Sequence, residues 1–268
     1  MTDTPLITDS HCHLDFPDFE GQLDEIVARA AQAGVRRMVT ICTRLRLEPQ
    51  VRTIAEAHDR VFYAAGTHPM SAADEPMAKL DELVALASHP KFVGIGETGL
   101  DYHYTGESAG VQQESLRIHI AAARETGLPL IIHSRAADED MARILSEEHA
   151  KGNFSCVMHC YSSGPELAQV ALELGFYLSM SGIAAFPKSQ EVRDIFSTAP
   201  VERVLVETDS PYLAPPPYRG KRNEPAYTVH TAKVGAELYG MDYAGFAAQT
   251  EANFERLFSK VAQYKAAA

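Results

Sequence analysis

The feature that constrains the fold most is a joint that recurs along the chain, in which a helical segment ends at a glycine and an apolar strand follows. It occurs in "ARAAQAGVRRMVTIC" around Gly34, in "HIAAARETGLPLIIHSR" around Gly127 and in "LAQVALELGFYLSMSG" around Gly175. Glycine directly after a helix adopts the left-handed conformation that ends the helix at little cost. Three such joints predict alternating helices and strands, and hence a parallel sheet covered by helices.

Short β-branched and apolar segments predict eight strands. The expected strands are Leu6–Ser10, Arg37–Cys42, Val61–Gly66, Phe92–Glu97, Leu130–His133, Phe154–His159, Phe176–Ser181 and Arg203–Glu207. The clearest helices between them are Phe19–Ala33, Asp74–Ala87, Gln112–Thr126, Asp138–His149 and Pro165–Leu174. Eight strand–helix units in about 210 residues favour an α/β fold of the TIM (β/α)8 barrel type. A doubly wound sheet is the alternative, but no glycine-rich phosphate loop follows the first expected strand.

The C-terminal part predicts two or more helices that pack on the barrel. Phe254, Leu257, Phe258 and Val261 have the i, i+3, i+4, i+7 spacing of an apolar helix face. No linker or low-complexity segment divides the chain. We therefore expect one domain over residues 1–268.

Composition and charge narrow the class of protein. The four cysteines form no Cys-x-x-Cys pair, so we expect reduced thiols. The N-terminus has no signal-like segment, and no run of about 18 apolar residues occurs, so we expect a cytoplasmic protein without a membrane span. Nothing indicates an obligate protein partner. The net charge of −12 disfavours nonspecific adhesion to nucleic acid, so such a substrate would need metal ions or a small basic cluster.

Histidines and carboxylates gather where the expected strands end. His11 and His13 in "LITDSHCHLDF" share one strand face, because alternate side chains point the same way. Barrel enzymes place their chemistry at this rim. The other polar residues at strand ends are His68, Glu97, His133, His159, Glu207 and Asp209. This set of donors predicts a metal site.

The size of the donor set favours two ions. Four imidazoles and two carboxylates exceed the needs of one catalytic zinc, and Glu97 between glycines could bridge two ions about 3.5–4 Å apart. Neutral histidines suit zinc, manganese, cobalt or nickel better than magnesium, and the residues leave the identity of the ion open. Cys12 and Cys160 adjoin these positions, but strand alternation predicts small buried side chains that face away.

Several segments resemble the signature segments of the TatD family of metal-dependent hydrolases. They are "DSHCHLDF", "GIGETGLDY", "PLIIHSRAADED", "MHCYSSG", "VETDSPYLAPPPYRGKRNEP" and "NFERLF", which together run over nearly the whole chain. The resemblance implies a TIM barrel of the amidohydrolase superfamily with a centre of two divalent ions (Mg²⁺, Mn²⁺ or Zn²⁺). It implies the ligands His11, His13, Glu97, His133, His159 and Asp209. It also implies a deoxyribonuclease, typically a 3′–5′ exonuclease on single-stranded DNA, with RNA as a further substrate.

This resemblance leads to expected roles in phosphodiester hydrolysis by a metal-activated water. We expect Asp209 to be the general base, Glu97 to bridge the ions and His68 to contact the phosphate or the leaving group. Glu207 would orient a neighbouring ligand.

Basic and aromatic residues near the rim are candidates for binding the nucleic acid. Arg135 lies two residues past His133, and Arg219, Lys221 and Arg222 lie in "YRGKRNEP". Tyr102, Tyr104, Tyr212 and Tyr218 could stack bases. A hydrolase of another ester or amide, such as aminoacyl-tRNA, is the alternative. A non-catalytic metal-binding or nucleic-acid-binding barrel is a second alternative, which the complete ligand set disfavours.

Overall fold

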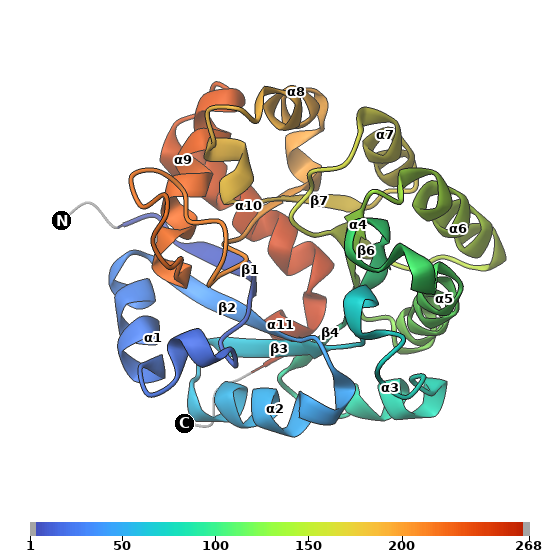
Figure 1. The fold of residues 1–268 in the computed structure, drawn as a ribbon. Coiled ribbons are helices and arrows are strands. Elements are labelled where there is room, and N and C mark those ends of the chain that lie inside the picture. Colours follow the sequence, from blue (N-terminus) through green and yellow to red (C-terminus); the bar gives the residue numbers. More distant parts are fainter. Residues whose placement is uncertain (1–3, 265–268) are drawn as a thin grey trace.

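The computed structural model describes residues 4–264 and shows eight parallel strands in one sheet, in the order β1 to β8 (Figure 1). Hydrogen bonds from His13 N to Ser210 O (2.8 Å) and from Asp209 N to His11 O (2.9 Å) join the last strand to the first. The predicted TIM barrel is confirmed. The strands are β1 Ile7–Cys12, β2 Val35–Cys42, β3 Val61–Ala65, β4 Phe92–Asp101, β5 Leu130–Arg135, β6 Cys156–Met158, β7 Tyr177–Met180 and β8 Val204–Val206.

Helices surround the barrel, and the glycines at the three predicted joints have positive φ angles of 95°, 70° and 81°. Within residues 4–264, no helix is long and apolar enough to cross a membrane. The helices are α1 Leu23–Gln32, α2 Glu48–Ala57, α3 Leu80–Leu86, α4 Tyr102–Thr105, α5 Ala109–Thr126, α6 Asp138–Lys151, α7 Pro165–Glu173, α8 Gln190–Thr198, α9 Thr228–Leu238, α10 Tyr243–Leu257 and α11 Ser259–Gln263.

Two predicted helices begin later than expected, and three further helices, including the four-residue α4, were not individually predicted. The helix expected from Asp74 begins only at Leu80, because Pro76 disfavours helical backbone just before it. Glu75 instead accepts a 2.8 Å hydrogen bond from Arg46. The helix expected from Phe19 begins at Leu23, after a 3₁₀ turn. The helices α2 and α8, of ten and nine residues, were missed.

The C-terminal helices seal the end of the barrel where the strands begin. Phe254, Leu257, Phe258 and Val261 are buried against the residues that face the barrel interior, which confirms the predicted apolar stripe. The stripe continues from α10 into α11, so it belongs to two helices. The side-chain amide of Asn253 donates to the carbonyl of Val204 at 2.8 Å and so fixes α10 to the start of β8. The opposite rim is left for the polar residues.

The packing of the C-terminal segment predicts a large loss of stability for Phe258→Ala. Phe258 is fully buried, so we expect the free energy of unfolding to fall by about 3–5 kcal/mol, as urea denaturation would measure. Val111→Ala on the exposed side of α5 is the control, with an expected change within about 0.5 kcal/mol. Equal stability of the two variants would contradict this account of the core.

Candidate metal centre

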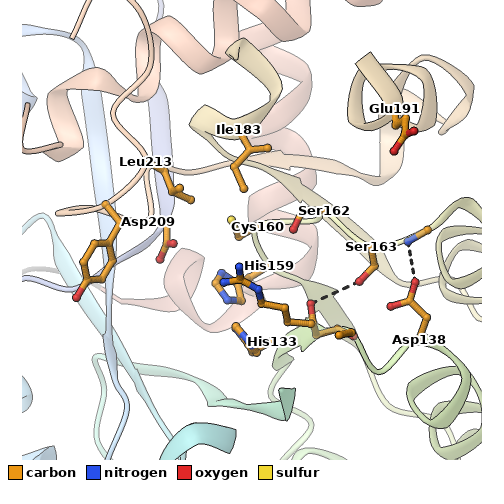
Figure 2. Close-up of a pocket in the computed structure, with 15 residues that line it drawn as sticks. His133, Asp138, His159, Cys160, Ser162, Ser163, Ile183, Glu191, Asp209 and Leu213 are labelled. Carbon is orange, nitrogen blue, oxygen red and sulfur yellow. Dashed lines mark hydrogen bonds between the residues drawn. The ribbon is translucent and has the colours of Figure 1, made fainter. Parts of the chain in front are cut away.

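The six expected ligands converge at the rim formed by the carboxyl ends of the strands. Three of them, His133, His159 and Asp209, face one cavity in Figure 2. His11 and His13 lie with their Nε2 atoms 3.3 Å apart, as their shared strand face predicts. Of the six residues, three lie on β1, β4 and β5, two directly follow β1 and β6, and Asp209 lies three residues after β8.

Glu97 lies between two sets of imidazoles. The Oε2 atom of Glu97 is 3.5 Å from His11 Nε2. On the same side, Asp209 Oδ1 is 3.3 Å from His13 Nε2. On the other side, the contacts are made by the second oxygen of Glu97. Its Oε1 atom is 2.7 Å from His159 Nε2 and 3.3 Å from His133 Nδ1. The two oxygens of one carboxylate therefore face two different groups of nitrogens.

Hydrogen bonds on the far side of three rings orient a nitrogen lone pair toward the centre. The tautomers follow from the partners: His13 Nδ1 donates to Ile41 O (3.3 Å), and His133 Nε2 donates to Asp101 Oδ2 (3.0 Å). His159 Nδ1 donates to Glu207 Oε1 (3.2 Å). In the neutral form of each ring the remaining nitrogen then has a lone pair that faces the centre, which is how metal-binding histidines are held.

The ring of His68 differs from these three because it directs an N–H group, not a lone pair, toward the centre. Its Nδ1 atom accepts a hydrogen bond from the backbone N–H of Met70 at 3.2 Å, and burial lowers the pKa of its ring. The neutral ring therefore carries its proton on Nε2, which lies 3.4 Å from Glu97 Oε1. His68 points a hydrogen-bond donor at the centre, unlike the three rings described above.

The centre is electrostatically coupled. Burial raises the pKa of the Glu97 carboxyl, but the neighbouring His159 and His68 outweigh this effect and hold it well below its usual range. Burial lowers the pKa of His159, but the Glu97 charge raises it well above its usual range. Burial lowers the pKa of all five rings at the centre, but the carboxylates outweigh this effect at His13, His133 and His159 and favour positive charge on these three. Imidazole nitrogens and carboxylate oxygens that face one another fit a divalent cation, whose binding would displace these protons.

Buried acidic residues support the ligands, as was predicted for Glu207. Its Oε1 atom also accepts a 2.7 Å hydrogen bond from Cys160 N. Asp101, which the sequence reasoning missed, holds His133 and lies four residues after Glu97 on β4. Asp9 was missed as well: it accepts hydrogen bonds from Thr208 N (2.9 Å) and Oγ1 (2.6 Å), and burial raises its pKa to about 8.

Glycines allow β4 to lie unusually close to β5 at the centre. Gly99 has a φ angle of 144°, and a Cβ atom there would lie 1.9 Å from the carbonyl oxygen of His133. Gly96 has a φ angle of 127°, and its Cβ atom would lie 2.5 Å from Ile131 O. Only glycine fits these positions, and the close approach places Glu97 beside His133.

His119 fixes the loop that carries His68. The ring of His119 is buried, accepts a 3.1 Å hydrogen bond from Thr67 N and donates a 2.7 Å hydrogen bond to Ser115 O. No local feature of the sequence signals the contact with Thr67, because the two residues are 52 positions apart.

Two cavities flank the centre, and His133, His159, Asp209 and Tyr212 line both. The polar cavity, of about 950 Å³, contains Ser134, Arg135, Ser162 and Ser163. The aromatic cavity, of about 850 Å³, contains Phe16, Leu47, Met70, Tyr104 and Tyr212. The side chain of Asp209 is 15% exposed and that of Glu97 only 2%, so Asp209, which lines both cavities, is the more accessible of these two carboxylates.

The structure brings one predicted arginine to the cavities and places two elsewhere. Arg135 lines the polar cavity, and Arg44, which was not predicted, lines the aromatic cavity. Arg219 lies over the Phe186 ring at 3.6 Å in a separate cavity. Arg222 donates to Asp18 O and to Gln22 Oε1.

The tyrosines divide in the same way. Tyr104 and Tyr212 line the aromatic cavity, whereas Tyr102 donates to Asp140 Oδ2 at 2.9 Å and Tyr218 stacks on Tyr227 at 3.8 Å.

The orientation predicted for Cys160 is wrong. This residue follows the end of β6 with a φ angle of 44°, so strand alternation does not apply, and it lines the polar cavity (Figure 2).

Comparison with known proteins identifies the family. The family model described as TatD related DNase matches residues 8–259. The chain belongs to the TatD family. It is 40% identical over 255 residues to the uncharacterized metal-dependent hydrolase YcfH of Escherichia coli, covering 94% of this chain and 95% of that protein. It is 37% identical over 253 residues to the uncharacterized metal-dependent hydrolase YabD of Bacillus subtilis, covering 94% and 99%.

Two further relatives bear on structure and activity. The 3′-5′ ssDNA/RNA exonuclease TatD of Salmonella typhimurium is 30% identical over 254 residues, with 93% of this chain and 97% of that protein covered. The crystal structure of YjjV, a TatD homologue of Escherichia coli, has a TM-score of 0.87 and 29% identity, with 94% and 98% covered. The protein is thus a metal-dependent hydrolase by family.

The contact between Glu207 and His159 predicts that Glu207→Gln weakens metal binding. A neutral amide holds the imidazole less firmly than a carboxylate, so we expect affinity for Zn²⁺ or Mn²⁺ to fall about 10–100-fold in chelator competition. Glu48→Gln is the matched control, because Glu48 is also buried but bonds to Arg52 and Tyr63. Unchanged affinity in Glu207→Gln would contradict the orienting role.

The buried ring of His119 predicts a loss of stability in acid. Burial lowers its pKa from 6.5 to about 4, so the folded state excludes a proton that the unfolded chain binds below pH 6.5. The neutral ring therefore costs the folded state nothing above pH 6.5, and the free energy of unfolding decreases as the pH falls from 6.5 toward 4. Between about pH 7.5 and about pH 5, we expect wild type to lose roughly 2 kcal/mol more than His119→Gln in urea denaturation. Parallel pH dependences would contradict the neutral, buried ring.

Proposed function

We propose that the protein is a metal-dependent nuclease that hydrolyses phosphodiester bonds, acting from the 3′ end of single-stranded DNA and also on RNA. The observation that carries this proposal is the placement of Glu97, whose two oxygens face separate groups of imidazoles. This placement supports a centre of two divalent ions, for which Glu97 would supply a shared carboxylate of the kind used in phosphoryl transfer.

We assign each ion its own ligands around Glu97. His11, His13 and Asp209 would hold one ion together with Oε2, and His133 and His159 would hold the other together with Oε1. Bound ions supply Lewis-acid charge that neutralises a phosphate and acidifies a water. Mg²⁺, Mn²⁺ and Zn²⁺ are all candidates for this site.

The chain's own residues then move the protons. Asp209 faces the cavities and accepts the proton of the attacking water as its oxygen bonds to phosphorus. The bond from phosphorus to the leaving oxygen breaks, and the Nε2 proton of His68 stabilises the leaving or a non-bridging oxygen. Arg135 and Arg44 lie where they can bind the neighbouring phosphates.

Local positive charge resolves the conflict between an acidic protein and an anionic substrate. The formal net charge is −12, but two bound ions together with Arg135 and Arg44 would concentrate positive charge at the two cavities. The name of the Salmonella relative also supports nucleic acid as the substrate.

The test is hydrolysis of 5′-labelled single-stranded DNA with Mg²⁺ or Mn²⁺ by wild type and Glu97→Gln. The substitution keeps the side-chain shape but removes the charge shared by both ions, so we expect kcat/KM to fall at least about 10³-fold. Wild type should release nucleotides stepwise from the 3′ end.

Glu191→Gln is the matched control, because Glu191 is an exposed glutamate at the margin of the polar cavity (Figure 2). Full activity is expected in that variant. No cleavage by metal-loaded wild type would overturn the nuclease proposal, and aminoacyl-tRNA and other esters would then be tested. Activity retained by Glu97→Gln would overturn the shared carboxylate.

A further inference from the structure

Exposed apolar side chains concentrate in the aromatic cavity. Among residues 4–264, the large hydrophobic side chains with substantial exposure are Leu6, Met70, Leu80, Tyr104, Val111 and Tyr212. Three of these six, Met70, Tyr104 and Tyr212, line the cavity beside the charged centre. Apolar surface left open at a polar site indicates a ligand that covers it.

Tyr104 is held in place yet remains open to solvent. The Arg135 guanidinium lies over its ring at 4.7 Å, and His103 contacts the ring edge-on at 4.6 Å. Its backbone N–H donates to Asp101 Oδ1 at 2.8 Å, and the other oxygen of Asp101 holds His133. Tyr104 is 54% exposed, so this ring is a supported surface at a fixed position relative to a proposed metal ligand.

Tyr212 stands at the boundary of the two cavities with a similar connection. It contacts Phe16 edge-on at 6.0 Å, and Phe16 stacks on His13 at 4.5 Å. Tyr212 is 55% exposed and lines both cavities. Two exposed rings are therefore each tied, through one neighbour, to a different ligand of the centre.

We propose that the aromatic cavity binds an unpaired nucleobase next to the scissile phosphate, with Tyr104 and Tyr212 as its stacking surfaces. This inference rests on the proposed nuclease function and adds a base-binding site to it. A base is flat and aromatic and is joined to a phosphate, which fits apolar rings beside a cationic centre. Arg44 at the cavity and Arg135 behind Tyr104 place positive charge next to the rings for the adjoining phosphates. A paired base would not expose its faces, so single strands are favoured.

The test compares KM for two labelled oligothymidylates, one intact and one with abasic residues flanking the cleaved bond. A stacked base contributes roughly tenfold in affinity, so wild type should show a KM about tenfold higher for the abasic strand. Tyr104→Ala should raise KM for the intact strand and remove most of this difference, and Tyr104→Phe should restore it. Tyr218→Ala is the matched control, because Tyr218 stacks on Tyr227 outside both cavities.

The outcomes separate this inference from the function on which it rests. Equal KM values of wild type for both strands, or unchanged discrimination in Tyr104→Ala, would overturn the base site while leaving the nuclease intact. Failure of wild type to cleave either strand or bis(p-nitrophenyl) phosphate would overturn the nuclease and the base site with it. Loss of discrimination in Tyr218→Ala as well would also count against the cavity.

Discussion

The site depends on one buried carboxylate surrounded by imidazoles. Glu97 is nearly inaccessible to water, and a charge in that position is costly unless opposite charge surrounds it. His133 and His159, whose pKa values are raised, supply that charge from other strands, and His11 and His68 direct ring nitrogens at the carboxylate. The same requirement that stabilises Glu97 therefore assembles the donors that a divalent cation needs. The contacts that stabilise the folded rim are thus the same contacts that bring the metal-binding groups together.

Backbone geometry brings these partners within reach. Two of the three glycines of β4, Gly96 and Gly99, let that strand lie against β5 where any Cβ atom would collide with its carbonyl oxygens. Between them Glu97 can approach His133, and four residues later Asp101 can hold the far side of the same ring. At the other end of the barrel, Phe254 of α10, Phe258 between the two helices and Val261 of α11 are buried in the interior. An apolar seal at one end thus leaves the opposite rim free for charged residues.

Much of this arrangement could be predicted, because it repeats with the period of the fold. Strand ends are recognisable from short apolar segments, and parallel strands bring their ends to one rim, so the histidines and carboxylates that meet there could be predicted one by one. What escaped prediction depends on contacts between distant segments. The bond from Thr67 to His119, the stacking of Arg219 on Phe186 and the bonds of Arg222 to Asp18 and Gln22 have no local signature. Cys160 escaped because alternation ends with the strand.

The polarity of each ring separates ligands from substrate contacts more clearly than distance does. His68 and His133 lie at nearly the same distance from Glu97 Oε1, at 3.4 and 3.3 Å. The carboxylate of Asp101 accepts a hydrogen bond from the outer nitrogen of His133, so in the neutral ring the inner nitrogen has a lone pair. The outer nitrogen of His68 instead accepts a hydrogen bond from the backbone N–H of Met70, so the inner nitrogen carries the proton. A cation is attracted by the first and repelled by the second. A phosphate oxygen prefers the reverse, so in the proposed reaction one rim would bind an ion and an anionic substrate side by side.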